Sequence, residues 1–316
     1  MRAHLAILYV STSKPASIAP LSNLCSSFKS SRGTHFAHTF SDVAYNRTSF
    51  YLVDTDPTNL ATSACELFKS VVDSPLDFAK HTGTHPTLGI LDHISFCPLR
   101  STDIVTEEDR MEDLLETGKS AKQFISMISP YTTVYAYGYA DEKVTSGNDE
   151  VPRLATIRKH LGYFEQSRSS TECTYDLDRL ALQIQKDFNG EAGDIKPVDG
   201  SLVEMDRKTG MTCVGAVPFM MNFNIKFPPT DSLTDVRKVT KAVKRLEGVE
   251  ALTLQHDAGY EVACNVKKPH LVGPESILSA GTEEANKLGL TVESSYSTGP
   301  NEQQLMDAFV ENLQIC

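Results

Sequence analysis

The sequence lacks C-x-x-C pairs, long apolar runs and any excess of basic residues. Its seven cysteines are an odd number and lie far apart, which argues against a disulfide framework or a zinc site and favours reduced thiols. The apolar run Leu5–Val10 is shorter than the ~7–15 residues of a signal-peptide core. No segment approaches the ~20 apolar residues that span a bilayer. We therefore expect a soluble, cytoplasmic protein.

The charge balance restricts the class of partner. Lys and Arg number 30 against 41 Asp and Glu, which gives a formal net charge of −11 at pH 7. Neutralising nucleic-acid phosphates requires clustered basic residues, so nucleic acid and anionic membranes are disfavoured as partners. A small anionic substrate stays possible, because a few local basic groups suffice to bind one carboxylate.

The hydrophobic pattern of the second half predicts a βαββαβ unit followed by a helix, the element order of a ferredoxin-like fold. Alternating apolar residues predict strands, while capping residues and a helical period predict helices. The expected strands are Phe219–Phe227, Val249–His256, Tyr260–Val266 and Leu290–Tyr296, and the expected helices follow Ser232, Gly273 and Pro300.

The first half predicts a similar order of elements. Strands are expected at His4–Val10, Phe36–Phe40, Ser49–Val53, Ile90–Phe96 and Val134–Tyr137, and helices at Ala16–Phe28, after Asp56 and after Thr106. The segments 141–152, 162–173 and 190–210 show no clear period. The predicted fold class is therefore α+β, with two ferredoxin-like α/β subdomains, open mixed β-sheets and helices on the sheet faces. The predicted domains are residues 1–200 and 201–316.

The segment from His81 to Gly89 holds the densest cluster of reactive residue types. The H-x-x-x-H spacing of His81 and His85 would suit a metal on a helix, but Gly83 and Pro86 oppose helix there. A metal hydrolase that uses His81, His85 and Asp92 is kept as an alternative. His85, held by its glycine and proline neighbours, is a candidate general base near neutral pH. From the residues alone, a loop histidine satisfied by backbone hydrogen bonds is the favoured interpretation.

Several motifs in the same order resemble the formiminotransferase domain of formiminotransferase-cyclodeaminases. They are Tyr45-Asn46-Arg47-Thr48, His81-x-Gly-x-His85-Pro86-x-Leu-Gly89-x-Leu-Asp92, Val134-Tyr-Ala-Tyr137-Gly138, Ile157-Arg158 and Val214-Gly215-Ala216. Three further segments are most similar to plant formiminotransferase-like members, namely Asp92-His93-Ile94-x-Phe96, Leu161-Gly162-Tyr163-Phe164 and Glu261-Val-Ala-Cys264-Asn265. The resemblance covers nearly the whole chain.

The resemblance implies a one-carbon transferase of histidine catabolism that moves a formimino group from N-formiminoglutamate to tetrahydrofolate. Tetrahydrofolate would act as co-substrate without a metal, and the family suggests a homodimer. The family's catalytic histidine matches His85. The implied substrate-binding residues are Asn46, Arg47, Thr48, Gly89, Tyr137, Gly200, Ser201, Gly210, Gly215 and Ala216. The chain ends at Cys316, so we expect no cyclodeaminase activity.

The chain departs from the family at several charged positions. The family's Pro-Asn-Phe-Ser-Glu-Gly segment is replaced by 10–15, an acidic residue by Thr84, an arginine by Thr87, and an Arg-Lys pair by Val217-Pro218. Each change removes a charge that would bind or polarise a substrate. A folate-binding protein with weak or lost transferase activity is therefore the alternative function.

Overall fold

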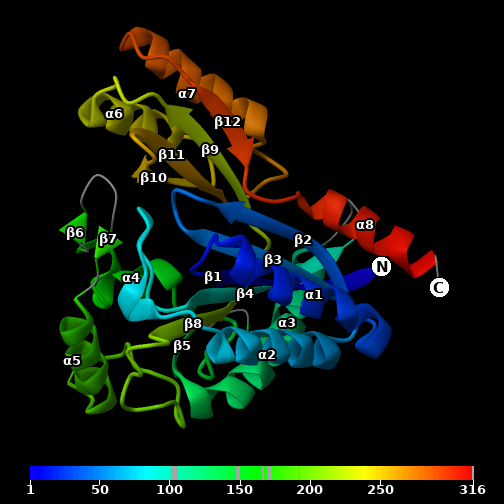
Figure 1. The fold of residues 1–316 in the computed structure, drawn as a ribbon. Helices are drawn as coiled ribbons and strands as arrows, with labels where there is room; N and C mark the ends of the chain where they lie inside the picture. The colour runs from blue at the N-terminus through cyan, green and yellow to red at the C-terminus, as the bar shows by residue number, and fades with distance from the viewer. Residues whose placement is uncertain are drawn as a thin grey trace.

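Two β-sheets form the framework of the protein, and Figure 1 shows them lying between two groups of helices. The computed structural model describes residues 1–100, 106–146, 150–165, 167–168, 173–174, 176–191 and 193–314. One sheet has six strands and the other has four. The predicted α+β class with two open sheets is confirmed.

The six-stranded sheet has the strand order β2-β3-β1-β4-β8-β5. Its first four positions form an antiparallel βαββαβ unit, as the ferredoxin-like prediction requires, and β8 and β5 extend the sheet in parallel with β4. The strands are β1 (Arg2–Val10), β2 (His35–Asp42), β3 (Arg47–Asp54), β4 (Leu91–Arg100), β5 (Thr133–Gly138) and β8 (Met211–Ala216).

Three long helices cover one face of this sheet, and local sequence explains where two of them begin. Thr106 and Asp109 form the predicted capping box of α3, and Asp56 accepts two backbone N–H groups at the start of α2. The helices are α1 (Pro15–Arg32), α2 (Pro57–Asp73) and α3 (Glu107–Ile128). The remaining elements here are η1 (Phe78–Lys80), η2 (Ser129–Tyr131), α4 (Leu154–His160), η3 (Tyr163–Glu165), β6 (Ser167–Arg168), β7 (Cys173–Thr174) and α5 (Leu177–Phe188).

The four-stranded sheet has the order β10-β11-β9-β12 and is antiparallel throughout, not mixed. Two helices cover its outer face, and a terminal helix returns to lie beside β2 and β4 of the first sheet (Figure 1). The elements are β9 (Met221–Phe227), α6 (Leu233–Val243), β10 (Val249–His256), β11 (Gly259–Val266), α7 (Pro274–Lys287), β12 (Ser294–Ser297) and α8 (Glu302–Gln314).

Strand β8 was not among the predicted elements. It is buried at every position and runs parallel to both neighbours, so its sequence shows no polar alternation. The chain therefore passes from the first sheet to the second between Ala216 and Met221, after the division proposed at residue 200. The sequence pattern does not predict helices α4 and α5 either, because the neighbouring segments 141–152, 162–173 and 190–210 show no clear period.

The two sheets share an apolar core on the side of the first sheet that α1–α3 leave open. Leu5, Tyr51 and Leu99 from the first sheet join one buried cluster with Phe219 and with Phe309 of α8. This shared core packs the second subdomain against the face formed by β1, β3 and β4.

The cysteines whose side chains the structure describes are buried. Cys25, Cys65, Cys97, Cys213 and Cys264 are buried free thiols. Burial raises the pKa of Cys25 and of Cys264 to about 12, so both are unreactive near neutral pH. No helix among the described residues has the length and apolarity to cross a bilayer.

We expect Phe309→Ala to lower the free energy of unfolding by about 3–5 kcal/mol, because it empties a buried aromatic site between α8 and the first sheet. Leu313→Ala, on the exposed side of the same helix, is the control and is expected to stay within about 0.5 kcal/mol. Urea unfolding measures both. Equal losses of unfolding free energy in the two variants would show that α8 does not belong to the shared core.

Candidate functional site

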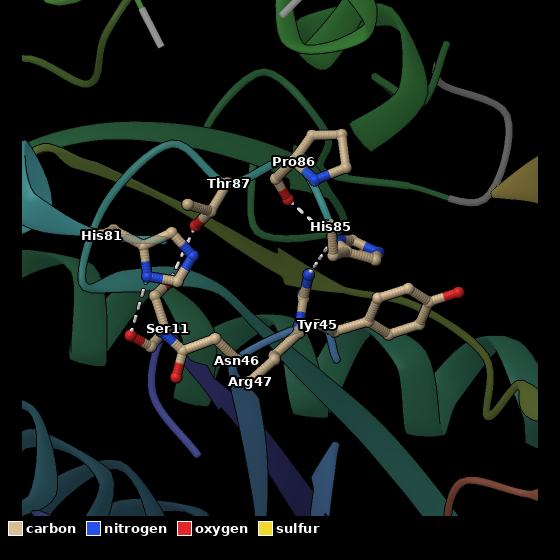
Figure 2. A pocket seen from close by; sticks show the side chains of 8 residues that line it. All are labelled: Ser11, Tyr45, Asn46, Arg47, His81, His85, Pro86 and Thr87. Atoms are coloured by element: carbon tan, nitrogen blue, oxygen red, sulfur yellow. Dashed lines mark hydrogen bonds between the residues drawn. The ribbon is translucent and has the colours of Figure 1, made fainter. Parts of the chain in front are cut away.

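The loop that carries His85 lies between η1 and β4, where β1 ends and β3 begins (Figure 2). Backbone hydrogen bonds fix it on several sides: Ser11 N donates to Ile90 O at 2.8 Å, Met211 N donates to Leu88 O at 3.0 Å, and Thr84 N donates to Ala44 O at 3.1 Å. The loop is therefore held by segments from three distant parts of the sequence.

Two predicted glycines permit close backbone approach in this loop. A Cβ on Gly89 would lie 2.4 Å from Met211 O, and a Cβ on Gly210 would lie 2.5 Å from the Cα of Gly89. Gly89 and Gly210 also pair as an isolated bridge. Both predicted site residues therefore shape the loop backbone next to His85.

Asn46 and Thr48 lie in and after the β2–β3 turn, with most of their polar atoms already engaged. Asn46 has a left-handed φ of 49°. Its Oδ1 accepts from Ser13 N at 2.8 Å, and its Nδ2 donates to Thr82 O at 2.6 Å. Thr48 Oγ1 donates to Thr12 O at 2.6 Å. These contacts orient the loop, and a substrate contact for either residue stays a prediction.

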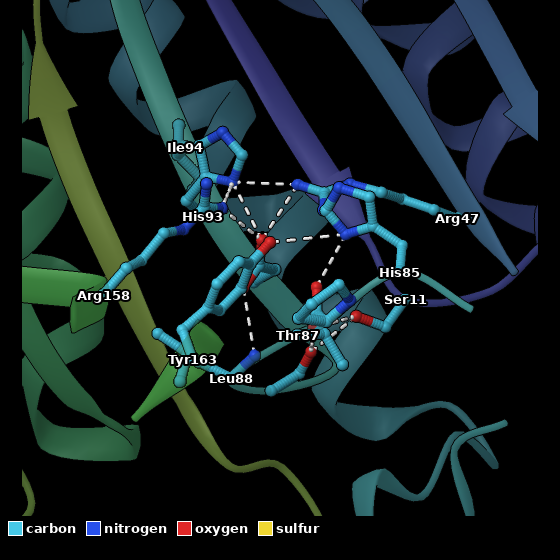
Figure 3. A network of polar contacts seen from close by, with 12 residues as sticks. Ser11, Arg47, His85, Thr87, Leu88, His93, Ile94, Arg158 and Tyr163 are labelled. Atoms are coloured by element: carbon cyan, nitrogen blue, oxygen red, sulfur yellow. Dashed lines mark hydrogen bonds and ion pairs between the residues drawn. The ribbon is translucent and has the colours of Figure 1, made fainter. Parts of the chain in front are cut away.

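Arg47 and Arg158 both form ion pairs with one buried carboxylate (Figure 3). Their Nη2 atoms lie 2.9 and 2.6 Å from Asp92 Oδ2, and Asp92 is 1% exposed. Burial by itself would raise the pKa of Asp92, but the two guanidinium groups hold it well below its usual value. The cluster of Arg47, Asp92 and Arg158, here called the Asp92 cluster, therefore carries one positive charge in excess.

His93 is a neutral partner of this cluster. Its ring stacks on Tyr9 with centroids 4.1 Å apart, and its Nδ1 lies 3.0 Å from the Nη2 atom of each arginine. Burial, followed by the charge of Arg158, lowers the pKa of His93 to about 3. The same Nδ1 lies 3.1 Å from Asp92 Oδ2, so the uncharged His93 ring packs against all three members of the cluster.

His85 touches the Asp92 cluster through Arg47. Its Nδ1 lies 2.7 Å from Pro86 O, 3.0 Å from Arg47 Nη1 and 3.3 Å from Tyr163 OH. The shorter contact, at 2.7 Å to a carbonyl oxygen, places a proton on Nδ1, because two lone pairs would repel at that distance; Arg47 Nη1 then contacts the ring without donating to Nδ1. This tautomer, assigned from the hydrogen-bond network, leaves the lone pair of the ring on Nε2.

The environment keeps the His85 imidazole uncharged. Burial, followed by the charge of Arg47, lowers the pKa of His85 well below its ordinary value of 6.5. The side chain is nevertheless only partly buried and lines a hollow. His85 is therefore a neutral acceptor at pH 7 whose protonated form is disfavoured by its neighbours.

The hollow beside His85 is narrow and has no volume that a water molecule could occupy. His81 lines it, with Nδ1 3.1 Å from Ser11 O, while its buried Nε2 has no hydrogen-bond partner among the described residues. Thr87 also lines the hollow, and its hydroxyl contacts Ser11 Oγ at 2.7 Å and Gly89 O at 3.0 Å. Thr87, at the position of the family's arginine, therefore stabilises the loop through these hydrogen bonds.

A larger groove of about 450 Å³ lies on the other side of Tyr45. It is lined by the β2–β3 turn, by His256 and Asp257, and by β12. The Tyr45 ring contacts His85 and His256 at centroid distances of 4.9 Å each, so Tyr45 stands between the hollow and the groove.

The other predicted site residues lie farther along the strands. Tyr137 OH contacts Ser95 Oγ at 2.7 Å, and Gly215 lies against the Tyr137 ring, where a Cβ would come within 2.1 Å. Ala216 ends β8.

Gly200 and Ser201 lie near the start of β5, where Ser201 Oγ accepts from Val134 N at 3.3 Å. Neither residue lines the hollow beside His85. Their predicted contact with a substrate stays a prediction.

Arg158 was not among the predicted site residues, although it stood in one of the motifs. It lies on α4, a helix that the hydrophobic pattern did not predict, and 66 residues separate it from Asp92. Only the Ile157-Arg158 motif pointed to it.

The metal alternative finds no support. In the part of the chain that the structure describes, no three His, Cys, Asp or Glu side chains are placed to hold a metal. Asp92, one of the three residues of that alternative, is instead held by two arginines.

Known proteins similar to this chain agree on one family. The formiminotransferase domain, N-terminal subdomain, matches residues 4–217. A formiminotransferase cyclodeaminase-like protein of Arabidopsis thaliana is 27% identical over 285 residues, covering 87% of this chain and 86% of that protein. A glutamate formimidoyltransferase of Streptococcus pyogenes serotype M1 is 26% identical over 226 residues, covering 72% of this chain and 63% of that protein. A solved structure of a microcompartment protein from Desulfitobacterium hafniense DCB covers 99% of both chains with 8% identity and a TM-score of 0.22, too low to support any argument.

We expect Asp92→Asn to lower the free energy of unfolding at pH 7 by about 3–5 kcal/mol, because two largely buried guanidinium groups lose their counter-charge. Glu283→Gln, which removes an exposed pair with Lys287, is the control and is expected to change it by less than about 1 kcal/mol.

The pH dependence has a definite sign. A folded-state pKa below the unfolded value of 3.8 stabilises the protein above that value. The contribution of Asp92 is therefore lost only as the pH falls through the lowered pKa. A difference between wild type and Asp92→Asn that already disappears at pH 6 would contradict this assignment.

Proposed function

The chain belongs to the formiminotransferase family, and from this premise we propose that it transfers a formimino or formyl group from an N-formiminoglutamate-type donor to tetrahydrofolate, with His85 as the general base. The observation that carries the proposal is the neutral imidazole of His85 in contact with a cluster that has one positive charge in excess.

The excess charge supports a glutamate-type donor. Arg47 and Arg158 share a single carboxylate, and in the part of the chain that the structure describes no group hydrogen-bonds to the buried Arg158 Nε. A donor carboxylate next to the Asp92 cluster would balance the charge and accept further N–H groups. The cluster thereby offers a charge for substrate binding that Thr84, Thr87 and Val217 do not.

The two cavities set limits on how a folate would bind. Sites for small molecules usually enclose about 300–1,000 Å³, so the groove of about 450 Å³ has a suitable size, whereas the hollow has no room even for a water molecule. We infer that the bulk of the folate occupies the groove and that only the reacting end reaches His85, with Tyr45 between the two. Tetrahydrofolate would supply the nucleophilic N5 amine.

The chain's own residues account for the proton transfers. His85 Nε2 takes the proton that the attacking amine loses as its nitrogen bonds to the formimino carbon. The same proton then passes from the imidazolium to the glutamate nitrogen as the old carbon–nitrogen bond breaks, so His85 ends as it began. Pro86 O keeps the Nδ1 proton in place, and this directs both transfers through Nε2.

A folate-binding protein without turnover is the second candidate. The small hollow and the two threonines that brace the loop favour it. The two candidates differ in one observable, which is transfer of the one-carbon group to bound tetrahydrofolate.

A cytoplasmic location, a place in one-carbon metabolism and a homodimer are also part of the proposal. They rest on the family and on the reduced-thiol composition. The mass of the protein in solution tests the homodimer.

We expect His85→Ala to reduce the rate of transfer by about 10²-fold or more, with tetrahydrofolate affinity little changed, because the variant loses the base and keeps the binding surfaces. The measurement is a donor screen with tetrahydrofolate, followed by kinetics on the donor found. His270→Ala, at an exposed histidine, is the matched control. Wild-type protein that binds tetrahydrofolate and transfers from no donor would instead favour the binding protein.

We expect His85 to stay unprotonated below the pH at which a free histidine titrates, because burial and Arg47 lower its pKa below 6.5. Diethylpyrocarbonate modifies only the neutral imidazole, so its rate at His85, measured by peptide mass spectrometry, should stay constant from pH 7 to pH 6. The same peptide in urea-unfolded protein should lose rate with a midpoint near 6.5. A common midpoint for folded and unfolded protein would refute the lowered pKa.

A further inference from the structure

Glu261 is a fully buried carboxylate on β11 that the proposed reaction does not use. It faces away from α6 and α7, because its neighbour Val262 belongs to the apolar core on the opposite side of the strand. Three donors reach it: Tyr45 OH and Tyr296 OH at 2.5 Å each, and Asn224 Nδ2 at 2.7 Å. Such complete hydrogen bonding is what allows a carboxylate to stay buried.

One of these donors comes from the other subdomain. Tyr45 lies in the β2–β3 turn, and its ring contacts the His85 ring edge-on, with an interplanar angle of 68°. A second link holds the same turn, since Asp42 Oδ2 pairs with His256 Nε2 at 3.0 Å and Asp42 Oδ1 accepts from Tyr45 N at 2.9 Å. The four-stranded sheet thus holds the turn at two points.

The β2–β3 turn also holds the loop that carries His85. Ala44 O accepts from Thr84 N at 3.1 Å, and Asn46 Nδ2 donates to Thr82 O at 2.6 Å. A Cβ at Gly83 would lie 2.5 Å from Tyr45 O, so the two backbones are in direct contact. A displacement of the turn therefore displaces the loop.

We propose that Glu261 and Tyr45 are positioning residues, through which the second subdomain sets the place and orientation of the His85 imidazole. The path runs from the Glu261 carboxylate to the Tyr45 hydroxyl, and from the Tyr45 ring and backbone to His85. Its consequence for catalysis rests on the proposed function, whereas the placement of His85 does not.

Tyr296 provides the matched comparison. Its hydroxyl donates to Glu261 at the same distance as that of Tyr45, but its ring stacks on Phe40 and not on His85. Tyr45→Phe and Tyr296→Phe therefore remove equivalent hydrogen bonds from one carboxylate, and only the first releases the neighbour of His85.

The test measures the rate of diethylpyrocarbonate modification at His85, together with kcat and KM for transfer. We expect Tyr45→Phe and Glu261→Gln to change the modification rate by about threefold or more, the scale of one lost hydrogen bond, and Tyr296→Phe to leave it unchanged. We also expect kcat to fall by about tenfold in the first two variants with KM nearly constant, because a misplaced base acts only on the chemical step.

The outcomes separate the positioning role from the function. Equal modification rates in Tyr45→Phe, Tyr296→Phe and wild type would overturn the proposal. An altered rate in a protein without transfer activity would support positioning and refute the transferase. If Glu261→Gln fails to fold, His256→Gln cuts the second link to the turn and is expected to alter the rate at His85 in the same direction.

Discussion

The ionised carboxylate of Asp92, held between the guanidinium groups of Arg47 and Arg158, is the interaction on which the site depends. It joins the start of β3, the start of β4 and helix α4, which are far apart in the sequence. A buried carboxylate is stable only with such partners. Because Arg47 also contacts His85, the charge state of the cluster determines how readily the imidazole takes up a proton.

Three consecutive residues at the end of the β2–β3 turn and the start of β3 connect the two sheets and the His85 loop. Tyr45 reaches the second subdomain at Glu261, Asn46 holds the His85 loop at Thr82, and Arg47 pairs with Asp92. The left-handed φ of Asn46 allows the three side chains to leave the turn in different directions. A short turn thereby links the placement of the His85 loop to the packing of the two sheets.

Sequence patterns predicted most helices and strands but not the side-chain contacts between residues that are far apart in the chain. Alternation and capping located most strands and helices, for example the helix after Thr106. Strand β8 was not predicted, because burial on both faces removes the alternation of apolar and polar residues. The pairing of Asp92 with Arg158 and of Tyr45 with Glu261 spans 66 and 216 residues, so no local pattern encodes it. Residue motifs brought these positions to notice without revealing which side chains meet.

The charge of the Asp92 cluster affects the proton affinity of His85. Two cations and one anion disfavour an imidazolium next to Arg47 in the absence of substrate. A bound carboxylate would cancel the excess charge and raise the proton affinity of His85. By the same linkage, protonated His85 would bind that carboxylate more tightly. Binding of a carboxylate beside His85 and proton uptake by its imidazole would then strengthen each other.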